Sequence, residues 1–253
     1  MIRGLYASAS SMASNQVKMD TLSNNLANAE STGFKKDMTV KESFPEMLLH
    51  RIEGGSRPTE IGSLHNGVGI DDNYTDFSQG NMINTENPLD MAIDGEAFFV
   101  VDTPAGERYT RNGNFVFDDT GQLVTQEGYP VQGEEGPIQG LPGEDIEVDT
   151  DGVVYVRDDD NLLEVDALEM VTFADEEAAE KIGDGLWEAE AGNVVEAEDY
   201  SVEQGFLEGA NVEVVNEMIN IIEASRHYEA NQRSIQAGDE TLQRVVNDVG
   251  SLR

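Results

Sequence analysis

The chain has 253 residues, with 15 Lys and Arg against 51 Asp and Glu, and a formal net charge of -36. This acidity excludes a general nucleic-acid binder and a protein that docks electrostatically on an anionic membrane, because both need a basic surface. Cysteine is absent, which excludes disulfides, thiol nucleophiles and cysteine-ligated metal sites. No segment reaches the ~18 consecutive apolar residues of a membrane span. The N-terminus lacks the apolar core of a cleaved signal, so we expect a cytosolic protein unless it leaves by another route.

The charge is unevenly distributed along the chain. Residues 1–50 hold five acids and five bases, and residues 205–253 hold eight acids and four bases, so residues 51–204 hold the remaining 38 acids and only six bases. Because like charges repel, this pattern predicts a solvated acidic middle between two nearly neutral ends that are free to pack. Our hypothesis for the acid load is a high-salt habitat, which a salt dependence of stability would test.

Near the N-terminus, apolar residues recur at the seven-residue spacing of helices that pack along a seam. These residues are Leu5, Met12, Met19 and Leu26, with Leu22 at a partner position. Gly33 is predicted to cap the helix in the left-handed conformation.

A longer seven-residue repeat begins at Val214. It continues through Ile221, Tyr228, Ile235, Leu242 and Val249. The companion register is half polar, since it comprises Met218, Ser225, Gln232, Asp239 and Val246. A helix of about 40 residues would be roughly 60 Å long, too long for the side of a small globule. We therefore favour a coiled coil of the two ends, with apolar surface left for other copies, over a helical hairpin packed on the middle domain.

The middle of the chain is typical of a β-domain. Turn-forming Asn-Gly and Asp-Gly pairs separate short apolar runs such as residues 97–101 and 153–156, which predicts compact antiparallel strands. Residues 45–65 contain Gly54-Gly55-Ser56-Arg57-Pro58 and are predicted to be an extended linker or arm. The predicted fold class is α+β. Its predicted domains are an N-terminal helix at 1–44, the arm at 45–65, the acidic β-domain at 66–204 and a C-terminal helix at 205–253.

No group of residues points to an active site. The three histidines, His50, His65 and His227, are scattered, and the chain lacks a nucleophile elbow, a phosphate-binding loop and a dinucleotide-binding glycine motif. With 51 acids, neighbouring carboxylates are expected by composition and identify no acid or base. We therefore predict no enzyme activity, catalytic residue or cofactor.

One acidic stretch approaches a calcium-binding loop. Glu147-Val148-Asp149-Thr150-Asp151-Gly152, followed by Asp158, departs from that motif at its first and last positions. The alternation of Val148, Val153 and Tyr155 favours strands joined by a hairpin turn at Asp151-Gly152, so we predict no metal site. The alternative function is a secreted or surface β-domain that binds calcium or carbohydrate on a coiled-coil stalk.

Motifs in three parts of the chain resemble those of flagellar rod and hook proteins. The N-terminal ones are Gly4-Leu5-Tyr6, Leu22-Ser23-Asn24-Asn25-Leu26-Ala27-Asn28 and Thr32-Gly33-Phe34-Lys35. The central ones are Pro88-Leu89-Asp90-Met91-Ala92-Ile93-Asp94-Gly95, Tyr109-Thr110-Arg111-Asn112-Gly113-Asn114-Phe115 and Gly121-Gln122-Leu123-Val124-Thr125. The C-terminal ones include Gly205-Phe206-Leu207-Glu208, Asn211-Val212, Met218-Ile219, Arg226, Tyr228-Glu229 and Asn231. The chain is too short for a hook protein and too long for a proximal rod protein. It is most similar to the distal-rod class, FlgG and FlgF, with the related Gram-positive hook-basal body proteins.

This resemblance implies a structural subunit of the basal-body rod. The subunit would leave the cell through the flagellar export apparatus without a cleaved signal and polymerise into a helical tube that transmits torque to the hook. Its partners would be copies of itself and other rod and hook subunits, with no nucleic acid or small-molecule substrate. The expected subunit-interface residues are Leu5, Met12, Met19, Leu22, Asn24, Asn25, Leu26, Asn28, Ile221, Tyr228, Ile235, Leu242 and Val249.

Overall fold

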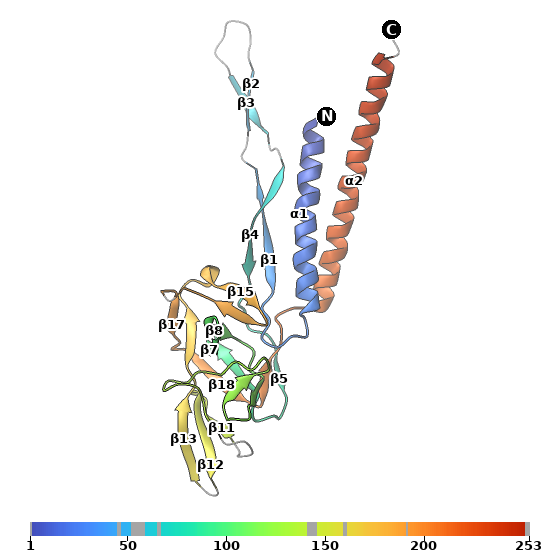
Figure 1. Ribbon diagram of the computed structural model, residues 1–253. Helices are drawn as coiled ribbons and strands as arrows, with labels where there is room; N and C mark the ends of the chain where they lie inside the picture. Colours follow the sequence, from blue (N-terminus) through green and yellow to red (C-terminus); the bar gives the residue numbers. More distant parts are fainter. Residues whose placement is uncertain are drawn as a thin grey trace. The chain divides into compact units, whose positions relative to one another are not determined.

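The computed structural model describes residues 2–44, 47–51, 59–64, 67–140, 146–158, 161–190 and 192–250. It confirms an α+β fold, with helix α1 (Ile2–Ala27), helix α2 (Val214–Gly250) and antiparallel strands between them (Figure 1). The chain divides into two compact units. The helical unit comprises Met1–Leu26, Asp37–Tyr74 and Glu213–Arg253, and the β-unit comprises Ala27–Lys36 and Thr75–Val212.

In the helical unit, α1 and α2 lie side by side (Figure 1). The Ser8 and Ser234 hydroxyls are 3.5 Å apart, and Asn231 Nδ2 donates to Ser11 Oγ at 2.9 Å. Gly238 lies so close to Leu5 that a Cβ placed on it would be 2.9 Å from Leu5 Cδ2. Small and polar side chains therefore allow the two helices to approach closely.

The face of α2 turned toward α1 carries the predicted repeat with a different companion register. Most of the covered positions follow alternating steps of four and three: Glu217, Ile221, Ala224, Tyr228, Asn231, Ile235, Gly238 and Leu242. Asn220 and Ser225, outside this series, are also half-buried. The companion residues are therefore Glu217, Ala224, Asn231 and Gly238, which corrects the register predicted from Met218. Residues three apart and residues four apart both lie on the same side of a helix. On this face the covered companions Ala224, Asn231 and Gly238 each lie three positions after a member of the repeat.

A two-stranded ribbon packs against the polar side of α1. Strand β1 (Asp37–Ser43) pairs with β4 (Val68–Thr75). Lys41 Nζ donates to Asn15 Oδ1 at 2.7 Å, and Thr39 Oγ1 donates to Thr21 Oγ1 at 3.0 Å. The helix thus ends at Ala27 and does not continue toward residue 44, because alternate residues of 37–43 face α1 as a strand.

The predicted arm contains a strand pair. Strands β2 (Met47–Arg51) and β3 (Thr59–Leu64) are antiparallel, with Met47 opposite Leu64. The glycine-rich stretch at 54–58 lies outside the described residues, as do His65 and Asn66.

The β-unit is built around a six-stranded antiparallel sheet in the order β15-β16-β8-β7-β14-β17. Its strands are β7 (Phe98–Thr103), β8 (Gly106–Thr110), β14 (Met170–Phe173), β15 (Glu180–Gly183), β16 (Leu186–Glu188) and β17 (Val194–Glu196). A second sheet contains β11 (Ile146–Val148), β12 (Val153–Asp158) and β13 (Asn161–Ala167). Three further pairs are β5 (Met82–Asn84) with β19 (Phe206–Glu208), β6 (Met91–Gly95) with β18 (Tyr200–Gln204), and β9 (Phe115–Phe117) with β10 (Leu123–Thr125). A short 3-10 turn spans Glu176–Ala178.

Strand β7 is buried on both faces, which explains its continuous apolar sequence. Phe99 and Val101 belong to the main hydrophobic core, and Phe98 and Val100 belong to a second, smaller core. The sheet therefore separates two apolar clusters, and β7 supplies alternate residues to each.

The predicted turn at Asp151-Gly152 is confirmed as a hairpin between β11 and β12. Gly152 has a φ of +81°, and its N–H donates to Asp149 O at 2.9 Å. Asp149 and Asp151 are thus explained by a turn, while Asp159 and Asp160 lie outside the described residues.

Within the part of the chain that the structure describes, no helix has the length and apolar content needed to cross a membrane.

Candidate functional site: a buried ion-pair knot

Two segments of the β-unit, far apart in sequence, lie against each other. One is residues 32–36, which follow α1 in the chain, and the other is residues 205–211, which precede α2. Gly33 N donates to Glu208 O at 2.7 Å, and Lys36 N donates to Asn211 Oδ1 at 2.7 Å. These two hydrogen bonds, one between backbones and one to a side chain, fix the register of the two segments, and we call their junction the knot.

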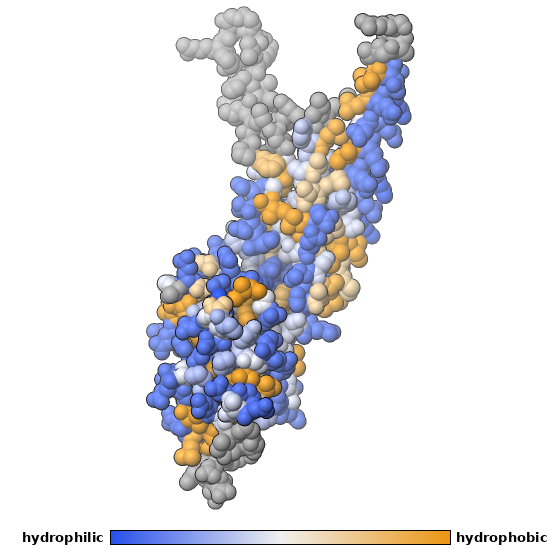
Figure 2. Space-filling view, in the orientation of Figure 1, coloured by the Kyte–Doolittle hydropathy of each residue, from blue (hydrophilic) through white to orange (hydrophobic). Residues whose placement is uncertain are grey.

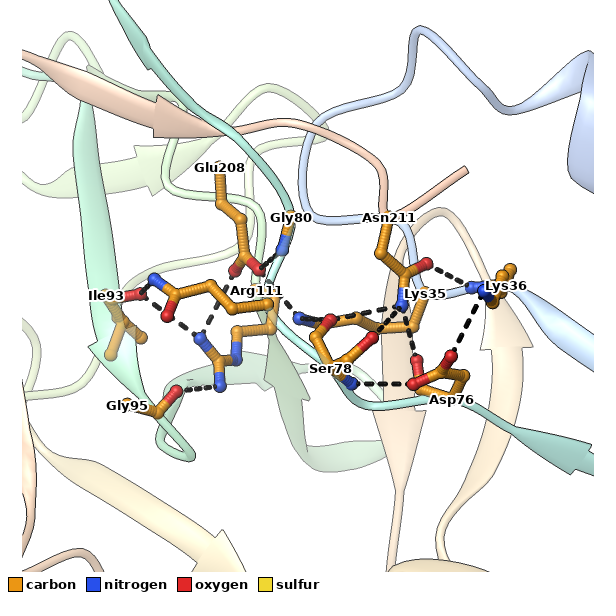
Figure 3. A network of polar contacts seen from close by, with 11 residues as sticks. Lys35, Lys36, Asp76, Ser78, Gly80, Ile93, Gly95, Arg111, Glu208 and Asn211 are labelled. Carbon is orange, nitrogen blue, oxygen red and sulfur yellow. Dashed lines mark hydrogen bonds and ion pairs between the residues drawn. The ribbon is translucent and has the colours of Figure 1, made fainter. Parts of the chain in front are cut away.

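A buried ion triad occupies the centre of the knot (Figure 3). Lys35 Nζ lies 2.7 Å from Glu208 Oε1, and Arg111 Nη1 lies 3.2 Å from Glu208 Oε2. The side chains of all three are at most 2% exposed. One carboxylate thus joins the segment after α1, the loop after β8 and the segment before α2.

Neutral groups supply further hydrogen bonds to the triad (Figure 3). Gly80 N donates to Glu208 Oε1 at 2.8 Å, and Lys35 Nζ also donates to Ser78 O at 3.0 Å. Arg111 donates to the carbonyl oxygens of Ile93 and Gly95. Buried charges are tolerated only when they are paired and hydrogen-bonded, and here the single anion accepts bonds from three donors.

The triad carries two cations and one anion, and this imbalance affects its titration. Burial lowers the pKa of Lys35, and the nearby Arg111 guanidinium acts in the same direction, while Glu208 opposes both. Burial likewise lowers the pKa of Arg111 against the opposing effect of Glu208. Glu208 is therefore the group on which the burial of both cations depends.

Gly33 allows the close approach of the backbones at the knot. Its φ is +66°, and a Cβ at this position would lie 2.5 Å from the carbonyl carbon of Arg111. Next to it, Thr32 Oγ1 donates to Asn112 Oδ1 at 2.7 Å. The predicted left-handed conformation is present, but α1 has already ended at Ala27, so Gly33 serves the knot and does not cap the helix.

Aromatic rings cover the knot on one side. Lys181 Nζ donates to Lys35 O at 2.6 Å and lies 4.7 Å from the Phe34 ring centroid and 5.2 Å from the Trp187 centroid. The Arg111 guanidinium lies 5.0 Å from the Phe98 centroid. Such cation–π contacts add to the stability of a desolvated cation. Trp187, the single tryptophan of the chain, is 2% exposed and is a natural probe of this region.

The basic residues of the β-unit are concentrated here. Its two sequence ranges contain 36 of the 51 acids but only Lys35, Lys36, Arg108, Arg111, Arg157 and Lys181 as bases. Four of these six take part in the knot and its covering layer, including Lys36, which pairs with Asp76 at 3.2 Å. Sequence reasoning assigned no role to Lys35, Arg111 or Glu208. Isolated bases in an acidic region were the signal that could have identified them.

The predicted interface residues lie in several environments. Leu22 and Asn25 are buried, and Asn24 is exposed. The half-buried residues are Leu5, Met12, Met19, Leu26, Asn28, Ile221, Tyr228, Ile235 and Leu242. Val249 lies in α2, but its side chain is outside the described part. Asn25 Nδ2 donates to Asp37 O at 2.8 Å and its Oδ1 accepts from Asp37 N, so its amide holds the start of β1.

Comparison with known proteins identifies the class to which this architecture belongs. Residues 5–35 match the flagella basal body rod protein family, residues 92–156 match the flagellar hook protein FlgE/F/G D1 domain, and residues 203–248 match the flagellar basal body rod FlgEFG protein C-terminal family. Each matched region supplies one member of the ion triad: Lys35, Arg111 and Glu208. The three matches together place the chain in the class of flagellar rod and hook proteins.

Full-length relatives narrow this class. The chain is 34% identical to the flagellar basal-body rod protein FlgG of Bacillus subtilis (strain 168), over 98% of this chain and 99% of that protein. It is 31% identical to the flagellar hook-basal body complex protein FlhO of the same organism and 30% identical to FlgF of Rhizobium meliloti (strain 1021), each over the full length of both chains. The chain belongs to the flagellar basal-body rod protein family. These relatives give no support to a calcium- or carbohydrate-binding domain.

Proposed function

We propose that this chain is a structural subunit of the distal part of the flagellar basal-body rod. It joins copies of itself in a helical tube that transmits torque from the motor to the hook. The relatives named as rod proteins support the structural role and the basal-body location. Passage through the flagellar export apparatus without a cleaved signal is part of this proposal, as is contact with other rod and hook subunits.

The observation that carries the proposal is a second apolar face on α2. Val215, Met218, Ile219 and Ile222 are 44–58% exposed, and Figure 2 shows hydrophobic residues, in orange, along this helix. Val215, Ile219 and Ile222 lie roughly opposite the face that is turned toward α1, and Met218 lies at the edge of this stripe. An amphipathic helix on the surface of a monomer normally has one apolar stripe. A second stripe indicates a second packing partner, and in a self-assembling subunit we assign it to another copy.

The unequal lengths of the helices leave a further apolar surface. α2 has 37 residues and α1 has 26. The next step of three along the α2 repeat after Leu242 is Val245, which is 51% exposed, and its neighbour Val246 is 68% exposed. We assign this end of α2, like the opposite stripe, to another copy. Two different patches on one chain make a heterologous contact, which generates open helical polymers when the rotation does not close.

In this arrangement the terminal helices form a coiled-coil core layer, and the acidic β-unit faces solvent. The nearly neutral termini can stack at high density, whereas the β-unit, with 36 acids against six bases, repels its copies. In this proposal, the predicted seam residues pack between α1 and α2 of one protomer and lie next to the contact with another copy.

The experiment compares two substitutions of an exposed isoleucine by aspartate. Ile222→Asp, in the α2 stripe, should abolish motility and the incorporation of the chain into basal bodies while the fluorescence of Trp187 stays unchanged. The control is Ile182→Asp in the β-unit, where the isoleucine is 50% exposed, and it should swim normally. Normal assembly of the Ile222→Asp chain would refute the proposed interface.

A further inference from the structure

The main core of the β-unit is completed by strands from the end of its sequence. Among the described residues, β6 pairs only with β18, and β5 pairs only with β19. Met91 and Ile93 of β6 and Val202 of β18 belong to the same hydrophobic core and are at most 2% exposed. Without β18, the inner side chains of β6 would lose their neighbouring strand.

Backbone bonds attach this last segment to several early parts of the unit. Val202 N donates to Thr150 O at 2.9 Å, and Gly205 N donates to Asp90 O at 2.8 Å. Gly209 N donates to Asn81 O at 2.8 Å. The segment 200–211 therefore contacts loops and strands from throughout the unit and is not a peripheral strand.

The ion triad independently indicates that the β-unit needs its last segment, because that segment carries Glu208. Glu208 is the carboxylate that pairs with both Lys35 and Arg111, and all three side chains are buried. A β-unit closed without Glu208 would hold two buried cations without this anion, which is strongly unfavourable. Neither cation can take its native position until the residues near 208 arrive.

From these two observations we propose that residues 200–211 are the closing element of the β-unit, so that the unit folds in one cooperative step that requires this segment. A consequence for export follows, and it rests on the proposed function as an exported rod subunit. A chain delivered N-terminus first could not complete the β-unit until nearly all of it had emerged.

Native-state hydrogen exchange on the full-length protein tests the inference without any mutation. Amides of β18 and of β7, in the centre of the sheet, should exchange through the same opening with the same dependence on urea. If β18 and β19 open at much lower urea while β7 stays protected, residues 200–211 are a detachable flap and the proposal is wrong.

A matched set of variants gives a second test. Val202→Ala should accelerate the exchange of β7 and β18 by the same factor, and Glu208→Gln should do the same if it folds. The control is Glu203→Gln, an exposed position on β18, which should leave both unchanged. Accelerated exchange confined to β18 would overturn the proposal. That outcome would leave the rod function standing, since the α2 variants test it separately.

The order of folding can be followed in the full chain by pulse labelling during refolding from urea. Protection of β7, protection of β18 and the fluorescence change of Trp187 should appear in one phase. Protection of β7 in an earlier phase than β18 would show that the unit forms without its closing element.

Discussion

Lys35 and Glu208 are separated by 173 residues in the sequence, yet their charged groups are 2.7 Å apart and both side chains are 1% exposed. The pair joins the segment that follows α1 to the segment that precedes α2, and Arg111 adds the loop after β8. Motifs from the N-terminal, central and C-terminal parts of the chain thus meet at one carboxylate. This contact gives a physical reason for the residue types found in all three.

Removal of the Glu208 charge should be severely destabilising. Glu208→Gln leaves Lys35 and Arg111 buried without their anion, and the loss of one partner of a buried pair typically costs about 3–5 kcal/mol. Urea unfolding followed by Trp187 fluorescence measures the free energy of unfolding. The control is Glu188→Gln, because Glu188 is 49% exposed in its pair with Arg108, and its effect should stay within about 1 kcal/mol. Equal effects of the two substitutions would contradict the assigned role of the triad.

Gly33 should tolerate no side chain. In Gly33→Ala, the left-handed backbone alone costs about 1–2 kcal/mol. The new Cβ would also lie 2.5 Å from the backbone of Arg111, so the loss should be larger. Gly128→Ala is the matched control, since Gly128 has a φ of +89° and no atom within 4 Å of the Cβ position. The same urea titration should therefore show a clearly larger loss for Gly33→Ala, and an equal loss would argue against close packing at the knot.

Protonation of Glu169 should stabilise the β-unit. Partial desolvation of the largely exposed Glu169 raises its pKa above the ordinary value of 4.5, and the carboxylates of Glu107, Glu134 and Glu196 raise it further. The folded state therefore holds this proton more tightly than the unfolded state. Its stabilisation is complete below pH 4.5 and is lost as the pH rises through the folded-state pKa.

Glu169→Gln should accordingly raise the melting temperature of the β-unit at pH 7 and have little effect at pH 4. Molar salt should reduce the difference at pH 7, because it screens the repulsion between carboxylates. A lower melting temperature at pH 7 would show that the Glu169 carboxylate stabilises the fold.

A charge in the seam between the two helices should disable the subunit without unfolding its β-unit. Ile235 is half-buried on the face of α2 that also carries Asn231 and Gly238. Ile235→Asp would place a carboxylate between α2 and α1, which should abolish swimming while Trp187 fluorescence remains native. The control is Gln236→Asp at the exposed neighbouring position. Normal motility of the Ile235→Asp strain would refute the seam assignment.

The sequence predicts the fold class and the spacing of the covered residues of α2 because periodic patterns depend on local geometry. The seven-residue repeat of α2 and the apolar run of β7 follow directly from helical and strand spacing. The more covered companion positions of α2, among them Glu217, Ala224 and Gly238, lie one residue before the register that continues from Met218. A seven-residue step alone does not distinguish these two registers.

The knot could not be predicted in the same way, because its parts are distant in the sequence. Nothing in the local pattern around Lys35 indicates that its partner is Glu208, and acids are so numerous that any base has many candidate partners. The strand at residues 37–43 was not predicted for a related reason. Residues 37–43 become a strand only because β4 pairs with them and α1 packs against alternate side chains.

The central claim, assembly through the exposed stripe of α2, is tested most directly by cysteine labelling. The chain has no cysteine of its own, so Met218→Cys introduces a unique thiol at a position that is 44% exposed. A maleimide should label it readily in the purified subunit and at least tenfold more slowly in basal bodies isolated from swimming cells. The control, Leu163→Cys in the β-unit, replaces a residue that is 54% exposed and should be labelled in both. Equal labelling of Met218→Cys in the subunit and in the basal body, or the absence of the chain from basal bodies, would contradict the account.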